Sequence, residues 1–111
     1  MIHYHGTPIT PNTMRNRMAG KHLCVSFVRP DNAAWALGNA QSVLWDNGAY
    51  SIFTRGEKAD WNKYYKWLEP LLGHPHWAII PDVIAGTVEE QRELVAAWPV
   101  SYTHLTLPTN R

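Results

Sequence analysis

Short apolar segments recur along the chain, and each is followed by turn residues and then by a stretch with a helical pattern. The clearest of them, residues 77–80, is apolar at every position and is followed by Pro81 and Asp82. A short, continuous apolar run is typical of a parallel strand that is buried on both faces. Strands that alternate with helices predict an α/β fold with parallel strands and crossover helices. We expect the strands near residues 1–5, 23–28, 42–45 and 77–80, although the alternation alone does not distinguish an open sheet from a barrel.

Two of the intervening stretches have the strongest helix patterns. Asp60 is placed to cap a helix over residues 60–72, whose apolar residues recur at i, i+3, i+4 and i+7 on one face. Thr87 and Glu90 have the Thr-x-x-Glu spacing of a capping box, which predicts a second helix over residues 87–98. Weaker patterns predict two short helices, over residues 11–19 and 31–37, the second of them capped by Asp31.

The composition excludes several classes of function. The 111 residues carry ten Lys and Arg against nine Asp and Glu, a net charge of +1, which excludes a polybasic nucleic-acid binder of the histone kind. No apolar run is long enough for a membrane span or for the apolar core of a secretory signal. The single cysteine, Cys24, excludes an internal disulfide and an all-cysteine metal site, and we expect it to be a buried, unreactive strand residue. These features favour a cytoplasmic protein without membrane contact.

Residues able to carry chemistry gather where the predicted strands end. In parallel α/β folds the functional site lies at the carboxyl ends of the strands. Three groups occupy that place: His3 with His5, the segment 46–50, and Asp82. His3 and His5 share one face of a strand, and this spacing can bind a divalent metal. The chain has neither a Gly-x-Gly-x-x-Gly motif nor a P-loop lysine motif, so a nucleotide-phosphate cradle of those kinds is not predicted.

Each group also has a purely structural interpretation. The segment 46–48 reads Asp-Asn-Gly, which is favourable turn chemistry and would leave Tyr50 as a packing residue. Asp82 would cap the next turn, and the rings of the histidine pair would bond to loop backbone. Two further histidines, His74 and His76, lie in a loop at the opposite end of a strand, and we expect them to be surface residues.

The last part of the chain differs in character from the rest. Charge and helical pattern both change after Trp98, and residues 100–105 read Val-Ser-Tyr-Thr-His-Leu. That string back-translates to part of a transposon mosaic-end sequence, and the following residues continue into the attached sequencing adapter. We therefore expect residues 100–111 to be an adapter-derived, non-native tail and residues 1–99 to be the native part of a longer protein. The alternative is a genuine strand, because Ser-Tyr-Thr-His-Leu also has strand composition.

Two motifs resemble those of tRNA-guanine transglycosylases. In that family one strand ends in Asp-Ser-Gly-Gly-Phe/Tyr, and a later strand ends in an acidic motif with Cys, followed by a helix that ends near Arg-Trp. Here the segment 46–50 reads Asp-Asn-Gly-Ala-Tyr, which keeps the Asp, the first Gly and the aromatic residue. The second motif keeps one acid, Asp82, and loses the Cys, and the helix after it ends at Trp98. The resemblance covers about residues 23–98.

The resemblance implies a (β/α)8 barrel that replaces guanine with a 7-deazaguanine in tRNA or DNA, with residues 1–99 as the N-terminal portion of the barrel. By matched position, Asp46 would handle the proton of the departing or incoming base, which requires hydrogen-bond reach and partial desolvation. Asp82 would accept from the N–H edge of the purine, and Tyr50 would stack on its face. Gly48 would allow close backbone approach with a φ that other residues resist. The substrate-binding set is completed by Asn47.

The family's nucleophile and its Cys/His zinc ligands lie further along its chain, so residues 1–99 would hold no cofactor and would be inactive alone. The implied partners are tRNA or DNA, a 7-deazaguanine base and, in a homodimer, a second copy of the chain. Two alternatives stay open. One is a metal-dependent hydrolase barrel with His3 and His5 as first-strand ligands. The other is a non-enzymatic module that binds nucleic acid or protein through its aromatic residues, and it would be favoured if Asp46 and Asp82 did not converge on one cavity.

Overall fold

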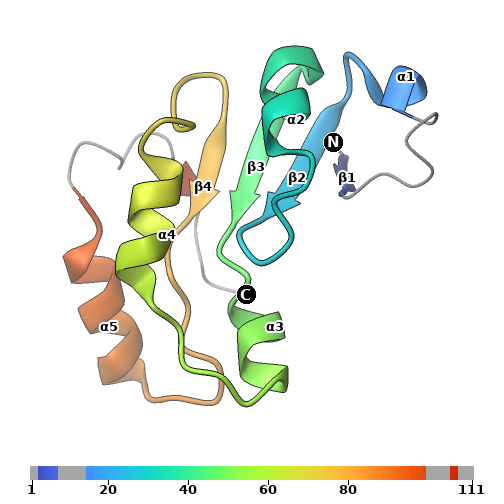
Figure 1. Ribbon diagram of the computed structural model, residues 1–111. Helices are drawn as coiled ribbons and strands as arrows, with labels where there is room; N and C mark the ends of the chain where they lie inside the picture. Colours follow the sequence, from blue (N-terminus) through green and yellow to red (C-terminus); the bar gives the residue numbers. More distant parts are fainter. Residues whose placement is uncertain (1–2, 8–14, 100–105, 108–111) are drawn as a thin grey trace.

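The computed structural model describes residues 3–7, 15–99 and 106–107, in which parallel strands alternate with helices (Figure 1). The strand order of the sheet is β1-β2-β3-β4-β5, and every neighbouring pair is parallel. The predicted α/β class, the parallel pairing and the strands predicted near residues 23–28, 42–45 and 77–80 are confirmed, and the first strand begins at Tyr4 in the described residues. The strands are β1 (Tyr4–Gly6), β2 (His22–Ser26), β3 (Ser42–Asp46), β4 (Trp77–Ile79) and β5 (Thr106–Leu107).

The short strand β5 falls within residues 100–111, the segment that resembles a sequencing adapter. It pairs in parallel with Ala78 and Ile79 of β4. The flanking residues 100–105 and 108–111 lie outside the described residues, as do residues 1–2 of the first predicted strand. The part of the sheet that positions the candidate site is formed by β1 to β4.

The helices connect consecutive strands, and the two long ones were predicted. In the part of the chain that the structure describes, no helix is both long and apolar enough to cross a membrane. One helix, α3, was not predicted: it begins directly after the Asp-Asn-Gly turn that follows β3. The helices are α1 (Arg15–Met18), α2 (Ala33–Asn39), α3 (Ala49–Thr54), α4 (Trp61–Leu68) and α5 (Val88–Ala97).

Side-chain caps fix the starts of α4 and α5. The Asp60 carboxylate accepts hydrogen bonds from two backbone amides in the first turn of α4. Thr87 and Glu90 form the predicted capping box at the start of α5. Both caps satisfy amides that have no partner inside the helix. The prediction that Asp31 caps α2 is wrong, because the capping position is Asn32, whose side chain makes no capping bond.

One face of the sheet carries the core. The register aligns Leu23 with Val43 and Val25 with Trp45, and all four side chains are fully buried. Residues two apart on a strand share a face, so these side chains form one apolar layer. The layer is covered by Ala36 of α2 and by Tyr64 and Leu68 of α4. Figure 1 shows α2 beside β2 and β3, with α4 beside β4.

The opposite face of the sheet is half-buried and more polar. Cys24, Leu44 and Trp77 form one row across β2, β3 and β4 on this face. Toward the amino ends of the strands, His22 Nδ1 lies 2.6 Å from Ser42 Oγ. By the same alternation, Asp46 belongs to this face, at the carboxyl end of β3. The two faces therefore differ in both burial and chemistry.

Candidate functional site

The loop after β3 is a tight turn held by its own side chains. The Gly48 N–H donates to Asp46 Oδ2 at 3.0 Å, and the Ala49 N–H donates to Asn47 Oδ1 at 2.8 Å. These bonds are Asx-type turn contacts, in which an Asp or Asn side chain replaces a backbone acceptor. The predicted Asp-Asn-Gly turn is therefore present, and it starts α3. The accompanying prediction that Tyr50 is a packing residue is wrong, because its side chain is exposed.

Gly48 meets the backbone requirement predicted for it. Its φ is 71°, in the left-handed region, where glycine is at no steric disadvantage. A Cβ at this position would lie 2.8 Å from Val28 Cγ1 and 3.2 Å from Ser26 Oγ. The glycine thus lets the turn pass close to the end of β2.

Asn47 joins the loops that follow β3 and β4. Its side chain is buried, with 2% of its surface exposed. Its Nδ2 donates to the Ile80 carbonyl at 2.8 Å and to Asp82 Oδ2 at 3.3 Å. An amide that bonds both a backbone carbonyl and a carboxylate fixes the second loop relative to the first. The structure therefore brings two of the predicted site residues, Asn47 and Asp82, into direct contact.

Gln91 of α5 holds the same loop from the other side, and the sequence analysis missed it. The Val83 N–H donates to Gln91 Oε1 at 2.9 Å, and Gln91 Nε2 donates to the Pro81 carbonyl at 2.9 Å. The two backbone groups flank Asp82. The only signal in the sequence is a polar, uncharged residue on a helix whose other polar positions are mostly charged.

Tyr64 of α4 ties the carboxyl ends of β3 and β4 together. Its single O–H donates to the Ile79 carbonyl at 2.7 Å, and the Trp45 carbonyl, at 3.3 Å, is a second and weaker acceptor of the same proton. Burial first, and the negative charge of Asp46 next, raise the pKa of this phenol well above its ordinary range, with a smaller contribution from Asp82. The hydroxyl therefore stays protonated as a donor, and both carboxylates act on it electrostatically.

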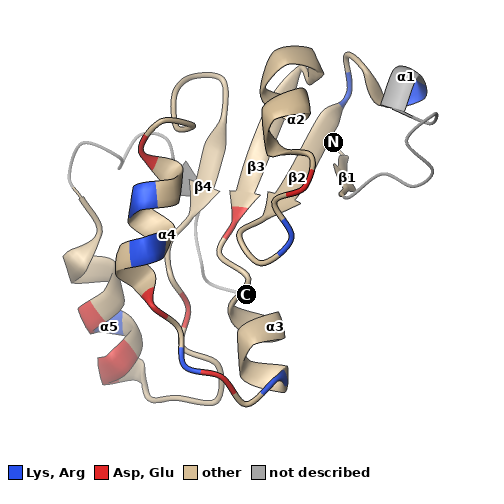
Figure 2. Ribbon diagram, viewed as in Figure 1, with Lys and Arg blue, Asp and Glu red and all other residues tan. Residues whose placement is uncertain are grey.

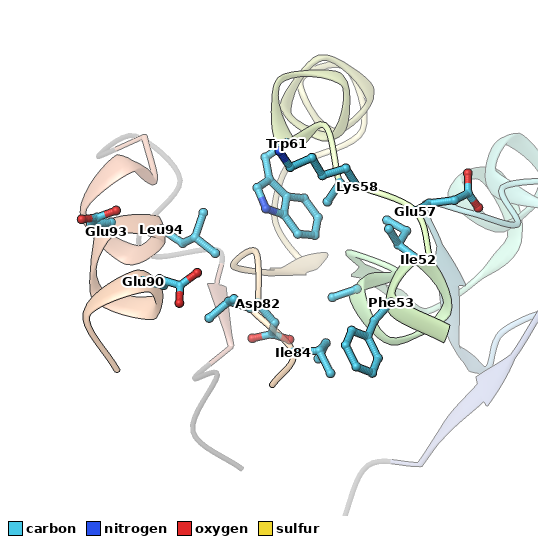
Figure 3. Close-up of a pocket in the computed structure, with 13 residues that line it drawn as sticks. Ile52, Phe53, Glu57, Lys58, Trp61, Asp82, Ile84, Glu90, Glu93 and Leu94 are labelled. Atoms are coloured by element: carbon cyan, nitrogen blue, oxygen red, sulfur yellow. The ribbon is translucent and has the colours of Figure 1, made fainter. Parts of the chain in front are cut away.

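A cavity of about 450 Å³ opens beyond the carboxyl ends of β3 and β4 (Figure 3). Its walls come from α3, the loop before α4, the loop after β4, and α5. In the close-up, Trp61 reaches into the cavity from α4, while Asp82 and Glu90 lie on the opposite side. Small-molecule sites commonly have volumes of about 300–1,000 Å³ and combine apolar walls with a few polar groups. The cavity has the size and the mixed lining of such a site.

The charge of the cavity is predominantly negative. Its lining includes Glu57, Asp82, Glu90 and Glu93 against a single lysine, Lys58. Figure 2 shows the acidic residues of α5 in red and the basic residues of α4 in blue. Carboxylates accept hydrogen bonds and repel anions. The cavity thus suits a ligand that presents N–H donors and disfavours a phosphate group.

Of the five predicted site residues, only Asp82 lines this cavity, and Asp46, Asn47, Gly48 and Tyr50 do not. Tyr50 lies in α3 with 70% of its surface exposed. Asp46 is half-buried and belongs to the half-buried face of the sheet, while the cavity lies among α3, α4 and α5. Asp82 lines the cavity and Asp46 does not, although Asn47 connects the two loops directly. The aromatic side chains that the structure does place at the cavity are Phe53 and Trp61, and both lie outside the two motifs.

The alternative metal ligands, His3 and His5, lie side by side on the first strand. Their ring centroids are 4.6 Å apart in an edge-to-face arrangement, as expected for residues that share a strand face. Among residues 3–7, 15–99 and 106–107, no group of three or more His, Cys, Asp or Glu side chains is arranged to hold a metal ion. The described residues thus give the histidine pair no further ligand.

The structure also shows the environments of Cys24 and His76, for which the sequence made predictions. Cys24 is half-buried on β2, and burial, with a smaller contribution from Asp46, raises the pKa of its thiol to about 11. A thiol of that pKa is protonated at neutral pH, in agreement with the expectation that Cys24 is unreactive. The prediction for His76 is wrong: it is half-buried, and its Nδ1 accepts a hydrogen bond from the Val43 N–H at 3.0 Å.

The chain was compared with protein families, curated proteins and solved structures. No protein-family model, no curated protein and no solved structure matches the chain. The chemistry of the site is therefore argued from its own residues.

Proposed function

We propose that this chain supplies the base-recognition part of an enzyme that exchanges a purine base on a polynucleotide, as tRNA-guanine transglycosylases do. The observation that carries the proposal is Asp82, a carboxylate fixed by a buried amide at the wall of a cavity of about 450 Å³. Its two oxygens would accept from the N–H edge of a guanine-type base. Trp61 offers the flat surface on which the base would stack.

Asp46 would act on the proton of the exchanged base. It ends β3 on the half-buried face of the sheet, and one of its oxygens accepts from the Gly48 amide. In a barrel this face lines the interior, and catalytic groups lie at the carboxyl ends of the strands. Asp46 would then approach the sugar side of the base from the interior, while Asp82 holds its outer edge.

The strand order supports a (β/α)8 barrel as the complete fold. Strands that pair in chain order, all parallel and each joined by a helical crossover, are the repeating unit of such a barrel. We propose that residues 1–99 form the first units of the barrel and that residues 100–111 are adapter-derived. The remaining strands, with the nucleophile and a zinc site, would come from the sequence that follows in the complete gene. The polynucleotide, tRNA or DNA, would be bound mainly through phosphate contacts away from the acidic cavity.

A second candidate is a non-enzymatic module that binds a nucleobase or a protein. It is favoured by one observation, the absence of Asp46 from the lining of the cavity that contains Asp82. In that case the role of Asp46 would be limited to accepting the Gly48 amide in the turn before α3.

The two candidates are separated by a base-exchange assay on the protein encoded by the complete gene. Incorporation of labelled guanine into tRNA and into DNA is measured for the wild type and for Asp46→Asn. The amide keeps the size of the side chain and an acceptor oxygen, but it cannot take up the proton. The proposal predicts that exchange falls by at least about a hundredfold, while polynucleotide binding is retained.

The matched control is Asp31→Asn, an exposed aspartate that is not among the residues lining the cavity. This variant should exchange guanine at the wild-type rate. Full activity of Asp46→Asn, or no exchange by the wild type on either polynucleotide, would favour the binding module instead.

A further inference from the structure

Gln91 makes two hydrogen bonds to the backbone on either side of Asp82. The Val83 amide donates to its Oε1, the Pro81 carbonyl accepts from its Nε2, and both distances are 2.9 Å. The side-chain amide thus pairs with one donor and one acceptor of an irregular segment, as a neighbouring strand would do. Both bonds reach across eight to ten residues of chain, from α5 back to the end of β4.

Asp82 is therefore held between two side-chain amides. Asn47 approaches its carboxylate directly from the loop after β3, and Gln91 fixes the peptide groups before and after it. Fixing both peptide groups restricts the backbone rotations that aim the carboxylate. A recognition group that is held in place before binding loses less conformational entropy when the ligand arrives.

We infer that Gln91 is a positioning residue that aims the Asp82 carboxylate at the base, an inference that rests on the proposed function. Gln91 touches Asp82 through its flanking backbone and does not itself line the cavity. Its loss should therefore weaken the binding of the base and leave the chemical step at Asp46 unchanged. This pattern differs from that of a structural residue, whose loss would reduce the amount of folded enzyme.

The first test is Gln91→Met in the protein encoded by the complete gene. Methionine has a similar length and apolar stem but makes neither hydrogen bond. We expect the KM for guanine to rise by about 3- to 10-fold, the equivalent of one or two hydrogen bonds, with kcat unchanged at saturating base. A fall in kcat with an unchanged KM would overturn the inference.

The second test uses Gln91→Glu, which keeps an acceptor for the Val83 amide. At neutral pH the introduced carboxylate is ionised and offers no donor to the Pro81 carbonyl. As the pH falls toward the ordinary glutamate pKa of about 4.3, it gains an O–H that can donate there. At each pH, the affinity of the variant for guanine is divided by that of the wild type. This ratio should rise on acidification for Gln91→Glu and should not rise for Gln91→Met. Parallel pH profiles for the two variants would contradict the role of the Pro81 bond.

The control is Gln41→Met, the same change at an exposed glutamine before β3, which should leave both KM and kcat at their wild-type values. Hydrogen–deuterium exchange of the Val83 amide separates this inference from the proposed function. If the wild type shows no base-exchange activity, the proposed function fails. The rate of hydrogen–deuterium exchange at the Val83 amide then tests by itself whether Gln91 holds the backbone around Asp82, a role we call the clamp. Faster exchange at Val83 in Gln91→Met, by about tenfold, supports the clamp. Equal exchange rates in the variant and the wild type overturn it.

Discussion

At the scale of single residues, Gly48 is a position where both the backbone conformation and the neighbouring side chains oppose a Cβ. Its positive φ and the contact that a Cβ would make with Val28 both oppose a side chain. We expect Gly48→Ala to lower the free energy of unfolding by about 1–3 kcal/mol, measured by urea denaturation. Gly38→Ala is the control, because Gly38 lies in α2 with nothing within 4 Å of the added methyl group. It should leave stability unchanged or raise it by up to about 1 kcal/mol.

His76 makes stability depend on pH. Its Nδ1 must be unprotonated to accept from the Val43 amide, and burial first, then the nearby His74, lower its pKa below the ordinary value of 6.5. Between 6.5 and that lower value the unfolded chain binds the proton and the folded chain does not. The contribution of His76 is therefore present above pH 6.5 and is lost as the pH falls below it.

His76→Asn tests this dependence, since Asn Oδ1 can take the place of Nδ1 as an acceptor that does not titrate in this range. Between pH 7.5 and 5.5 the wild type should lose up to about 1 kcal/mol more stability than this variant. His74→Asn removes an exposed histidine and should keep most of the wild-type pH dependence. If His76→Asn and the wild type lost the same free energy of unfolding between pH 7.5 and 5.5, the bond from the Val43 amide to His76 would not be the cause of the pH dependence.

At the scale of elements, the helix caps show which helices can be predicted from the sequence and which cannot. The starts of α4 and α5 are fixed by side chains within three residues of the helix, so Asp60 and the Thr87–Glu90 pair could be identified from the sequence. Helix α3 could not be, because its six residues include aromatic and β-branched types and its start depends on the turn before it. Local sequence patterns therefore predict a helix whose start is fixed by neighbouring side chains, and they miss a helix whose start depends on the surrounding fold.

The cap of α4 is tested by Asp60→Ala, which removes the acceptor for two amides of the first turn. Loss of such a cap should lower the free energy of unfolding by about 1 kcal/mol. Asp31→Ala is the matched control, because Asp31 was expected to cap α2 and does not. Equal effects of the two changes in urea denaturation would argue against the capping role.

At the scale of the whole molecule, the site depends on contacts between distant segments. Asn47 reaches Asp82 across 35 residues, and His76 reaches Val43 across 33. The parallel sheet explains both contacts. It brings the amino ends of β3 and β4 together, where His76 contacts Val43, and it brings their carboxyl ends together at the other edge, where Asn47 contacts Asp82. The sequence could indicate Asp46 and Asp82 at that edge. It could not indicate that Phe53 and Trp61 line the cavity, that Gln91 holds the backbone around Asp82, or that Asp46 lies outside the cavity, because these features depend on how the helices pack.

The acidic cavity also fits the charge of the molecule as a whole. Its lining is negative although the chain is nearly neutral, at +1. The negative potential is thus local and would act on what enters the cavity, not on a polynucleotide at long range. A ligand with N–H donors, such as the proposed purine base, is compatible with this distribution.

The most direct test of the central claim, that Asp82 reads the N–H edge of a purine, is the affinity for guanine relative to 1-methylguanine. The methyl group removes the N1–H donor and leaves the ring in place. In the protein encoded by the complete gene, calorimetry should show that the wild type binds guanine at least about a hundredfold more tightly, because the analogue leaves the carboxylate unpaired. Asp82→Asn should lose most of that preference, and Asp31→Asn should keep it. Equal affinities of the wild type for guanine and 1-methylguanine would contradict the account.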